Sequence, residues 1–194
     1  MEALTSFPPV RVGAARDLAH RLLRGLPERW EHTAGVAHRA AQIAVTVGPD
    51  DGDLLVAAAW LHDIGYADAL AGTGFHPLDG ARYLDRAGWP RRLSALVAHH
   101  SGARFVAAAR GLAADLARYP REESPLADAL TYADQTVGPY GRPVGVRQRM
   151  SGMLARHGVD SPHARVHRRR GPYLLAVARR VQRRLARAAA ECRR

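Results

Sequence analysis

Apolar residues recur at helical spacing along almost the whole chain, and this periodicity limits the fold more than any other feature of the sequence. One stripe, for example, places Val36, Ala40, Ile43 and Val47 on a single helix face. No segment alternates apolar and polar residues with the period of two that a half-buried strand needs. The sequence therefore predicts an all-α fold, a single-domain helical bundle of six to nine helices.

Glycine and proline mark where these helices end. They divide the chain into expected helices over residues 12–24, 31–47, 53–62, 77–87, 90–100, 103–118, 125–135, 146–157 and 172–191. The segment VGPYGRPVG, residues 137–145, holds three glycines and two prolines, so we expect a loop there.

The chain has 194 residues, 47% of them hydrophobic, which suits one domain with a substantial core. No apolar run approaches the ~20 residues of a membrane-spanning helix. The N-terminal stretch MEALTSFPPV lacks the basic start and apolar run of a signal peptide, so we expect a cytoplasmic protein. Cys192 is the single cysteine, which excludes an internal disulfide and a Cys-based zinc site. Any metal site must therefore use histidine and carboxylate.

The net charge of +11 does not by itself indicate a nucleic-acid-binding protein. All 29 basic residues are arginine, and residues 160–194 hold 11 of them against only Asp160 and Glu191. This tail carries a charge of +9, so the other 159 residues sum to about +2. The basic tail either binds nucleic acid or anionic lipid, or packs an apolar stripe on the bundle with arginine facing solvent. We favour packing.

Histidine and aspartate occur at the ends or on the apolar faces of several expected helices. The candidate metal ligands are His32, His62, Asp63, His76, His99, His100 and Asp134. A carboxylate on an apolar face costs several kcal/mol to desolvate unless it is paired or binds a metal. Each residue alone is more simply explained as a hydrogen-bonded core residue or a helix cap, but their joint occurrence favours a metal site. Imidazole and carboxylate suit Fe, Mn, Zn, Co or Ni, and all-oxygen Mg or Ca sites need no histidine.

The order His, His-Asp, Asp resembles the HD-domain superfamily of metal-dependent phosphohydrolases, over about residues 30–136. The matching motifs are LHDIGY at 61–66 and YADQT at 132–136. HPLDGARYL and AHHSG resemble the extra histidine motifs of the dinuclear subgroup, which includes the HD-GYP cyclic-dinucleotide phosphodiesterases. The GYP extension is absent, and the stretch between Asp63 and His76 is short. The chain is therefore more similar to a compact, stand-alone bacterial HD hydrolase.

This resemblance implies which residues would bind the metal ions and take part in catalysis. His32, His62, Asp63 and Asp134 would hold one metal, and Asp63 would bridge to a second one completed by His76, His99 and, in one arrangement, His100. A hydroxide between the metals would attack phosphorus, so Asp63, His62 and His100 are the candidate catalytic residues. The resemblance leaves open whether His100 binds a metal ion or donates a hydrogen bond to the substrate. We expect one or two divalent transition-metal ions, with Fe or Mn favoured over Zn, Co or Ni.

The resemblance also suggests three parts of the chain. Residues 1–29 form an N-terminal helix packing on the core, 30–136 the HD-domain core with the metal site, and 137–194 a Gly/Pro loop with Arg-rich C-terminal helices. Arg142 and Arg147 follow Asp134 closely, so they are candidates to bind a substrate phosphate, against the simpler interpretation as surface residues. The remaining histidines have no motif context and are expected to be surface or structural: His20, His38, His157, His163 and His167.

Three functions fit these observations. The favoured one is a metal-dependent phosphohydrolase acting on a nucleotide or related small phosphoester. The first alternative is an HD-type di-iron oxygenase, for which His32, His62, Asp63, His76, His99 and Asp134 would supply six ligands. The second is a non-enzymatic HD scaffold or nucleic-acid-binding module that uses the basic tail. The expected partner is a small phosphorylated substrate, and the sequence leaves a homo-oligomer open.

Overall fold

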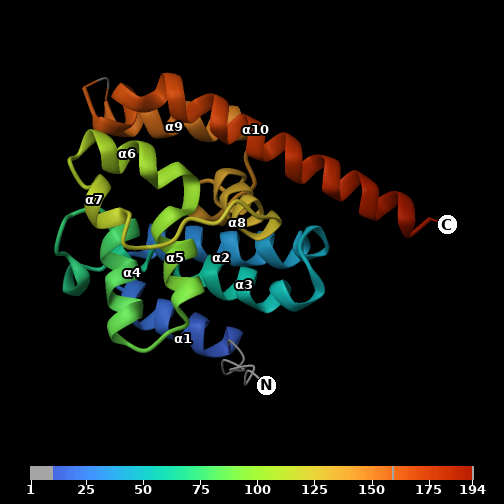
Figure 1. Ribbon diagram of the computed structural model, residues 1–194, viewed down its shortest axis with the longest axis horizontal. Coiled ribbons are helices and arrows are strands. Elements are labelled where there is room, and N and C mark those ends of the chain that lie inside the picture. Colours follow the sequence, from blue (N-terminus) through green and yellow to red (C-terminus); the bar gives the residue numbers. More distant parts are fainter. Residues whose placement is uncertain (1–10, 159, 194) are drawn as a thin grey trace, which may run out of the picture.

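The computed structural model describes residues 11–158 and 160–193, and within them the chain forms helices and no strand (Figure 1). The all-α prediction is confirmed. The described residues contain ten α-helices joined by short 3₁₀ turns, one more than the expected range. Residues 1–10, where the signal-peptide prediction and part of the N-terminal segment fall, lie outside this description.

Three helices form the centre of the bundle. Helix α2 (Pro27–Gln42) packs on α3 (Gly52–Leu61), and both contact α8 (Pro125–Gln135). Helix α3 is buried around most of its circumference, and its three consecutive alanines, residues 57–59, are fully inaccessible. Small side chains let the neighbouring helices approach closely. The carboxyl end of α3 is therefore held in the middle of the protein.

The other helices surround this centre. Helix α1 (Val12–Leu23) packs on α3, and α4 (His76–Arg86) packs on α5 (Arg91–His99). Helix α9 (Val146–His157) lies beside the first half of α10 (Pro162–Glu191), across the end of the bundle opposite α1 (Figure 1). None of the described helices combines the length and the apolar character needed to cross a bilayer.

Two expected helices have different bounds. The stretch 103–118 is divided into α6 (Ala103–Ala109) and α7 (Ala113–Leu116), because Gly111 adopts a left-handed backbone with φ +73° that ends the first helix. The second helix begins at Pro27 rather than residue 31, since proline fits the first turn of a helix. It also ends at Gln42, and a 3₁₀ turn, Ala44–Thr46, follows.

The last helix begins ten residues before its predicted start. The sequence predicts a helix over residues 172–191, but α10 starts at Pro162 after Ser161, whose side chain accepts a hydrogen bond from the Ala164 amide. Pro172 lies inside the helix and removes one backbone donor. The helix continues because Leu174, Val177 and other apolar residues of α10 are buried against the bundle, including α8. Its end extends past the bundle (Figure 1).

Two glycines permit close backbone contacts next to the motif residues. A Cβ atom on Gly65 would lie 2.1 Å from the carbonyl oxygen of His76. A Cβ atom on Gly35 would lie 2.6 Å from Gly141 Cα. Only glycine allows these approaches, so Gly65 brings the start of α4 against the end of α3, and Gly35 brings the loop after α8 against α2.

Candidate metal centre

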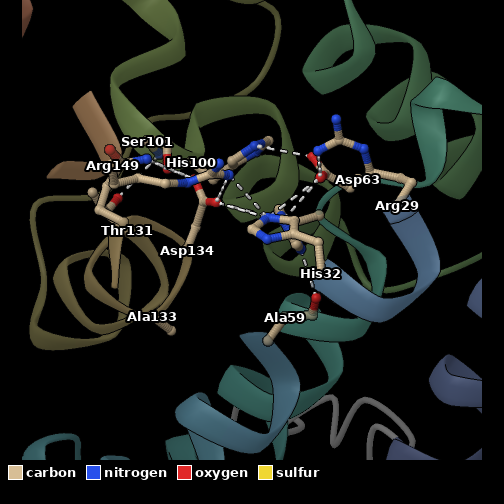
Figure 2. Close-up of polar contacts among 12 residues, drawn as sticks. Arg29, His32, Ala59, Asp63, His100, Ser101, Thr131, Ala133, Asp134 and Arg149 are labelled. Carbon is tan, nitrogen blue, oxygen red and sulfur yellow. Dashed lines mark hydrogen bonds and ion pairs between the residues drawn. The ribbon is translucent and has the colours of Figure 1, made fainter. Parts of the chain in front are cut away.

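Residues from five separate helical segments meet at the carboxyl end of α3. His32 comes from α2, and His62 and Asp63 directly follow α3. His76 is the first residue of α4. His100 follows α5, and Asp134 lies in the last turn of α8 (Figure 2). All are buried except His76, which is half-buried.

The first group of possible ligands contains His32, His62 and Asp63, whose donor atoms all lie within 4.8 Å of one another. The Oδ2 atom of Asp63 is 3.3 Å from His62 Nε2 and 3.7 Å from His32 Nε2. Asp134 adjoins this group, since its Oδ1 atom lies 3.1 Å from His32 Nε2 and 4.0 Å from His62 Nε2.

The second group contains Asp63, His76 and His100, again within 4.8 Å. Here the other carboxylate oxygen is used: Asp63 Oδ1 lies 3.3 Å from His76 Nε2 and 3.9 Å from His100 Nε2. The two Nε2 atoms of His76 and His100 are 3.4 Å apart. Asp63 therefore presents one oxygen to each group, which is the arrangement of a bridging carboxylate.

Backbone carbonyls orient three of the rings. The Nδ1 atoms of His32, His62 and His100 lie 3.1, 2.7 and 2.6 Å from the carbonyl oxygens of Gly138, Ala59 and Val97. Because a carbonyl only accepts, each neutral ring carries its proton on Nδ1 and leaves the Nε2 lone pair directed at the centre. His62 Nε2 is buried without a hydrogen-bond partner among the described residues. A metal ion would satisfy this atom, so the donor set fits a transition metal.

A family model of the HD domain matches residues 29–137. The chain belongs to the HD-domain family. HD domains form a superfamily of metal-dependent hydrolases. The buried His/Asp groups of this HD domain could bind a metal ion. Comparison with curated proteins and with solved structures gave no match.

The charges of the HD-domain residues suit metal binding. Burial raises the pKa of Asp63, but His62 and Arg29 outweigh it and hold that pKa well below its usual value. The pKa of Asp134 is also held low, against burial, by its contact with His32 and by Arg149. Burial lowers the pKa of His76 far below its usual value. The carboxylates are thus ionised and His76 is neutral, which are the forms that bind metals, whereas Asp63 outweighs burial and raises the pKa of His62, so a metal ion would have to displace the proton of that ring.

Two arginines contact the two carboxylates of the candidate metal centre. Arg29 Nη1 donates to Asp63 Oδ2 at 2.8 Å, and Arg149 Nη2 lies 3.5 Å from Asp134 Oδ1 and 3.3 Å from His32 Nε2. Arg29 with Asp63 lies on one side of His32, and Arg149 with Asp134 lies on the other (Figure 2). The second oxygen of Asp134 accepts from the Ser101 hydroxyl and from Gln135 Nε2. Arginine side chains therefore flank the candidate metal centre on two sides.

A cavity of about 220 Å³ opens over this centre. Its floor includes Asp63, His76, His100 and Asp134. Helices α9 and α10 supply the opposite wall, with the side chains Arg149, Met153, Arg156, His157, His163 and Arg170. The candidate metal centre of the HD domain is thus accessible to a small ligand through a positively charged opening.

The expected ligand His99 is not brought to the centre. Its Nε2 atom lies 2.8 Å from the carbonyl oxygen of Tyr119, and it lines a separate hollow on the other side of α5. The chain leaves the helical conformation at His100, with ψ 153°, so the two neighbouring side chains diverge. His100 stands where His99 was expected, and the geometry makes it a ligand candidate.

The expected phosphate-binding arginines also lie elsewhere. Arg142 and Arg147 are exposed and are not among the residues that line the cavity. Four other arginines line it: Arg29, Arg149, Arg156 and Arg170. Arg29 was detectable from sequence, because it precedes His32 by three residues and shares its helix face. The other three depend on how α9 and α10 cross the bundle, as do His157 and His163, which also line the cavity.

Proposed function

We propose that this HD-domain protein is a metal-dependent phosphohydrolase that cleaves a phosphoester of a nucleotide or related small molecule. One observation carries the proposal: the two oxygens of Asp63 face two different histidine groups at the floor of an arginine-lined cavity. This pattern supports two cations bridged by Asp63, next to side chains that favour phosphate.

His32, His62, Asp63 and Asp134 would hold one ion, and Asp63, His76 and His100 a second one. Ions bound here would lower the pKa of water and stabilise negative charge on the phosphoryl oxygens. Hydrolysis then forms a bond between the water oxygen and phosphorus, breaks the ester P–O bond, and returns a proton to the leaving alcohol.

The chain itself would orient the substrate. Arg29 and Arg149 stand on either side of the centre, and each is held by a carboxylate of that centre. A cation bound to Asp63 would compete with Arg29 for Oδ2 and free the guanidinium to bind a phosphate oxygen. The alanine and valine residues Ala103 and Val106, with Met153, cover apolar parts of the cavity wall and limit the water around the phosphate.

Purified protein loaded separately with Mn²⁺, Fe²⁺, Co²⁺, Ni²⁺ or Mg²⁺ should hydrolyse at least one substrate in a panel of nucleotides and phosphoesters. His100→Gln should lower kcat/KM by ~100-fold or more, as loss of a metal or catalytic contact does. His99→Gln is the matched control, since His99 is the adjacent residue and lies outside the cavity. Absence of turnover with every metal, or full activity of Asp63→Ala, would refute the proposal.

The donor set also suits the di-iron oxygenase alternative, now with His100 in place of His99 as the sixth ligand. The arginine lining favours a phosphorylated substrate over it. Oxygen consumption by protein reconstituted anaerobically with Fe²⁺ separates the two reactions, because hydrolysis consumes none. The scaffold alternative is disfavoured by the buried charges of the centre, which a protein without metal has no need to carry.

A further inference from the structure

We propose that the wall formed by α9 and α10 is a second anion site, and that the substrate is a compact molecule with two phosphate groups. The distal anion site consists of Arg156, His157, His163 and Arg170. This inference rests on the proposed function, because it assigns the cleaved phosphate to the metal centre and the second phosphate to the opposite wall.

Arg170 provides the strongest argument. Its residue is only 8% exposed, yet it lines the cavity. Its Nε atom donates to the carbonyl oxygen of Ser101 at 2.8 Å, and its other N–H groups have no acceptor in the described part of the chain. Burial lowers the pKa of Arg170, Asp134 offsets part of this effect, and the nearby Arg149 lowers the pKa further, so the charge is held at a cost in free energy. A bound anion would supply the missing partner.

Two of the four arginines that line the cavity, Arg156 and Arg170, form no ion pair with the residues that the structure describes. Arg29 and Arg149 already contact Asp63 and Asp134. Arg156, in the last turn of α9, forms no ion pair with the described residues, and the third carboxylate of the lining, Glu28, attracts it only from beyond contact distance. The lining therefore holds four arginines against three carboxylates, and any metal ion adds further positive charge. A single phosphate at the metal centre would leave the wall uncompensated.

Two histidines complete the wall. His157 ends α9 and His163 begins the first turn of α10, and their rings stack with centroids 4.2 Å apart and an angle of 13° between the planes. Both line the cavity. The two stacked rings and the Arg156 guanidinium therefore line the same cavity, and all three can donate hydrogen bonds to an anion.

The same cavity offers little to a nucleobase. The Tyr66 ring stacks on His76 with centroids 4.0 Å apart, and the Arg29 guanidinium carbon lies 4.0 Å from its centroid, so the ring is already in contact with two side chains. The other phenyl-type ring in the lining, Phe75, is buried. At about 220 Å³ the cavity is smaller than the ~300–1,000 Å³ of typical sites for drug-sized ligands. Charge rather than base stacking would select the substrate, and this favours a sugar bisphosphate or pyrophosphate over a whole nucleotide.

Calorimetry with methylenediphosphonate and inorganic phosphate tests the anion site without turnover. Protein with and without Mn²⁺ should bind the diphosphonate at least ~10-fold more tightly than phosphate, as expected for added charge-assisted hydrogen bonds. Arg156→Gln, at an exposed position that tolerates substitution, should remove most of this preference. Arg147→Gln removes the same charge from an exposed position of the same helix outside the cavity, and should keep it. Arg170→Lys tests the buried arginine of the same wall and should also weaken diphosphonate binding.

Kinetics with matched substrates test specificity. Fructose 1,6-bisphosphate should have a higher kcat/KM than fructose 6-phosphate, and Arg156→Gln should raise KM for the bisphosphate alone. Equal kcat/KM values, or equal binding of phosphate and diphosphonate, would overturn the two-phosphate inference and leave the phosphohydrolase intact. Binding of diphosphonate that depends on Arg156, with no hydrolysis of any phosphoester, would instead overturn the phosphohydrolase and retain the anion site.

Discussion

Replacing Gly65 by alanine should separate the two halves of the candidate metal centre. The added Cβ would lie 2.1 Å from the His76 carbonyl oxygen and 2.7 Å from the Gly80 amide nitrogen. Ordinary contacts begin near 3.4 Å, so the start of α4 must move by about 1.3 Å. Both neighbours are backbone atoms, and no side-chain rotation relieves the clash. Overpacking of this kind costs ~1–3 kcal/mol or more of folding free energy.

The movement has a specific consequence for the ligands. His76 is the first residue of α4, and its Nε2 atom lies 3.3 Å from Asp63 Oδ1. A shift of α4 opens the second group, Asp63, His76 and His100, whereas the first group lies on α2 and at the end of α3 and does not move with it. Gly65→Ala should therefore bind fewer metal ions than wild type and keep an ion at the first group.

Urea denaturation followed by circular dichroism measures the stability, and plasma mass spectrometry of dialysed protein measures the metal content. Gly152→Ala in α9 is the control, because nothing lies within 4 Å of its added Cβ. It should stabilise the protein by ~0.5–1 kcal/mol, as alanine does in a helix interior. Wild-type stability and metal content in Gly65→Ala would refute the reasoning.

Three other predictions follow from the geometry. A saturating divalent metal at ~100 times its Kd should stabilise the fold by about 2.7 kcal/mol, seen as a higher Tm; His62→Ala should lose this shift, and His99→Gln should retain it. Asp128→Ala should cost ~1–2 kcal/mol in urea unfolding, because Arg180 and Arg184 both bind Asp128 and join α10 to α8 in a partly exposed contact. Burial and His157 lower the pKa of His163 from 6.5 to about 4, so the unfolded chain takes up a proton first and stability should fall as the pH drops from 6.5 to 4. His163→Gln should flatten that part of the stability profile; an unchanged profile contradicts the assignment.

The pair His99 and His100 shows where prediction from sequence reaches its limit. Both residues end the same helix in AHHSG, and their chemistry is identical. The choice between them depends on the backbone at His100, which leaves the helix and directs one ring toward Asp63 while the other faces Tyr119. No local pattern distinguishes the two, since the direction of each ring is set by the packing of α5 against its neighbours.

The arginines show the same limit over a longer distance. Arg142 and Arg147 are close to Asp134 in sequence, but Arg142 lies in the loop before α9 and Arg147 in the first turn of α9, and both side chains are exposed outside the cavity. Arg170 is 36 residues beyond Asp134 and reaches the site because α10 begins ten residues earlier than expected and continues through Pro172. A proline normally marks a helix start or break, and only the buried contacts of α10 overcome that preference.

Helical periodicity in the sequence was enough to predict the all-α fold class, and the motifs LHDIGY and YADQT were enough to suggest the family by resemblance. The histidine and aspartate residue types of the candidate centre follow from local residue chemistry. The tertiary structure decided that Asp63 divides its oxygens between two groups, that His100 rather than His99 faces it, and that α9 and α10 bring a cationic wall over the cavity. These depend on where helices end and how they cross, and the packing of distant segments fixes both.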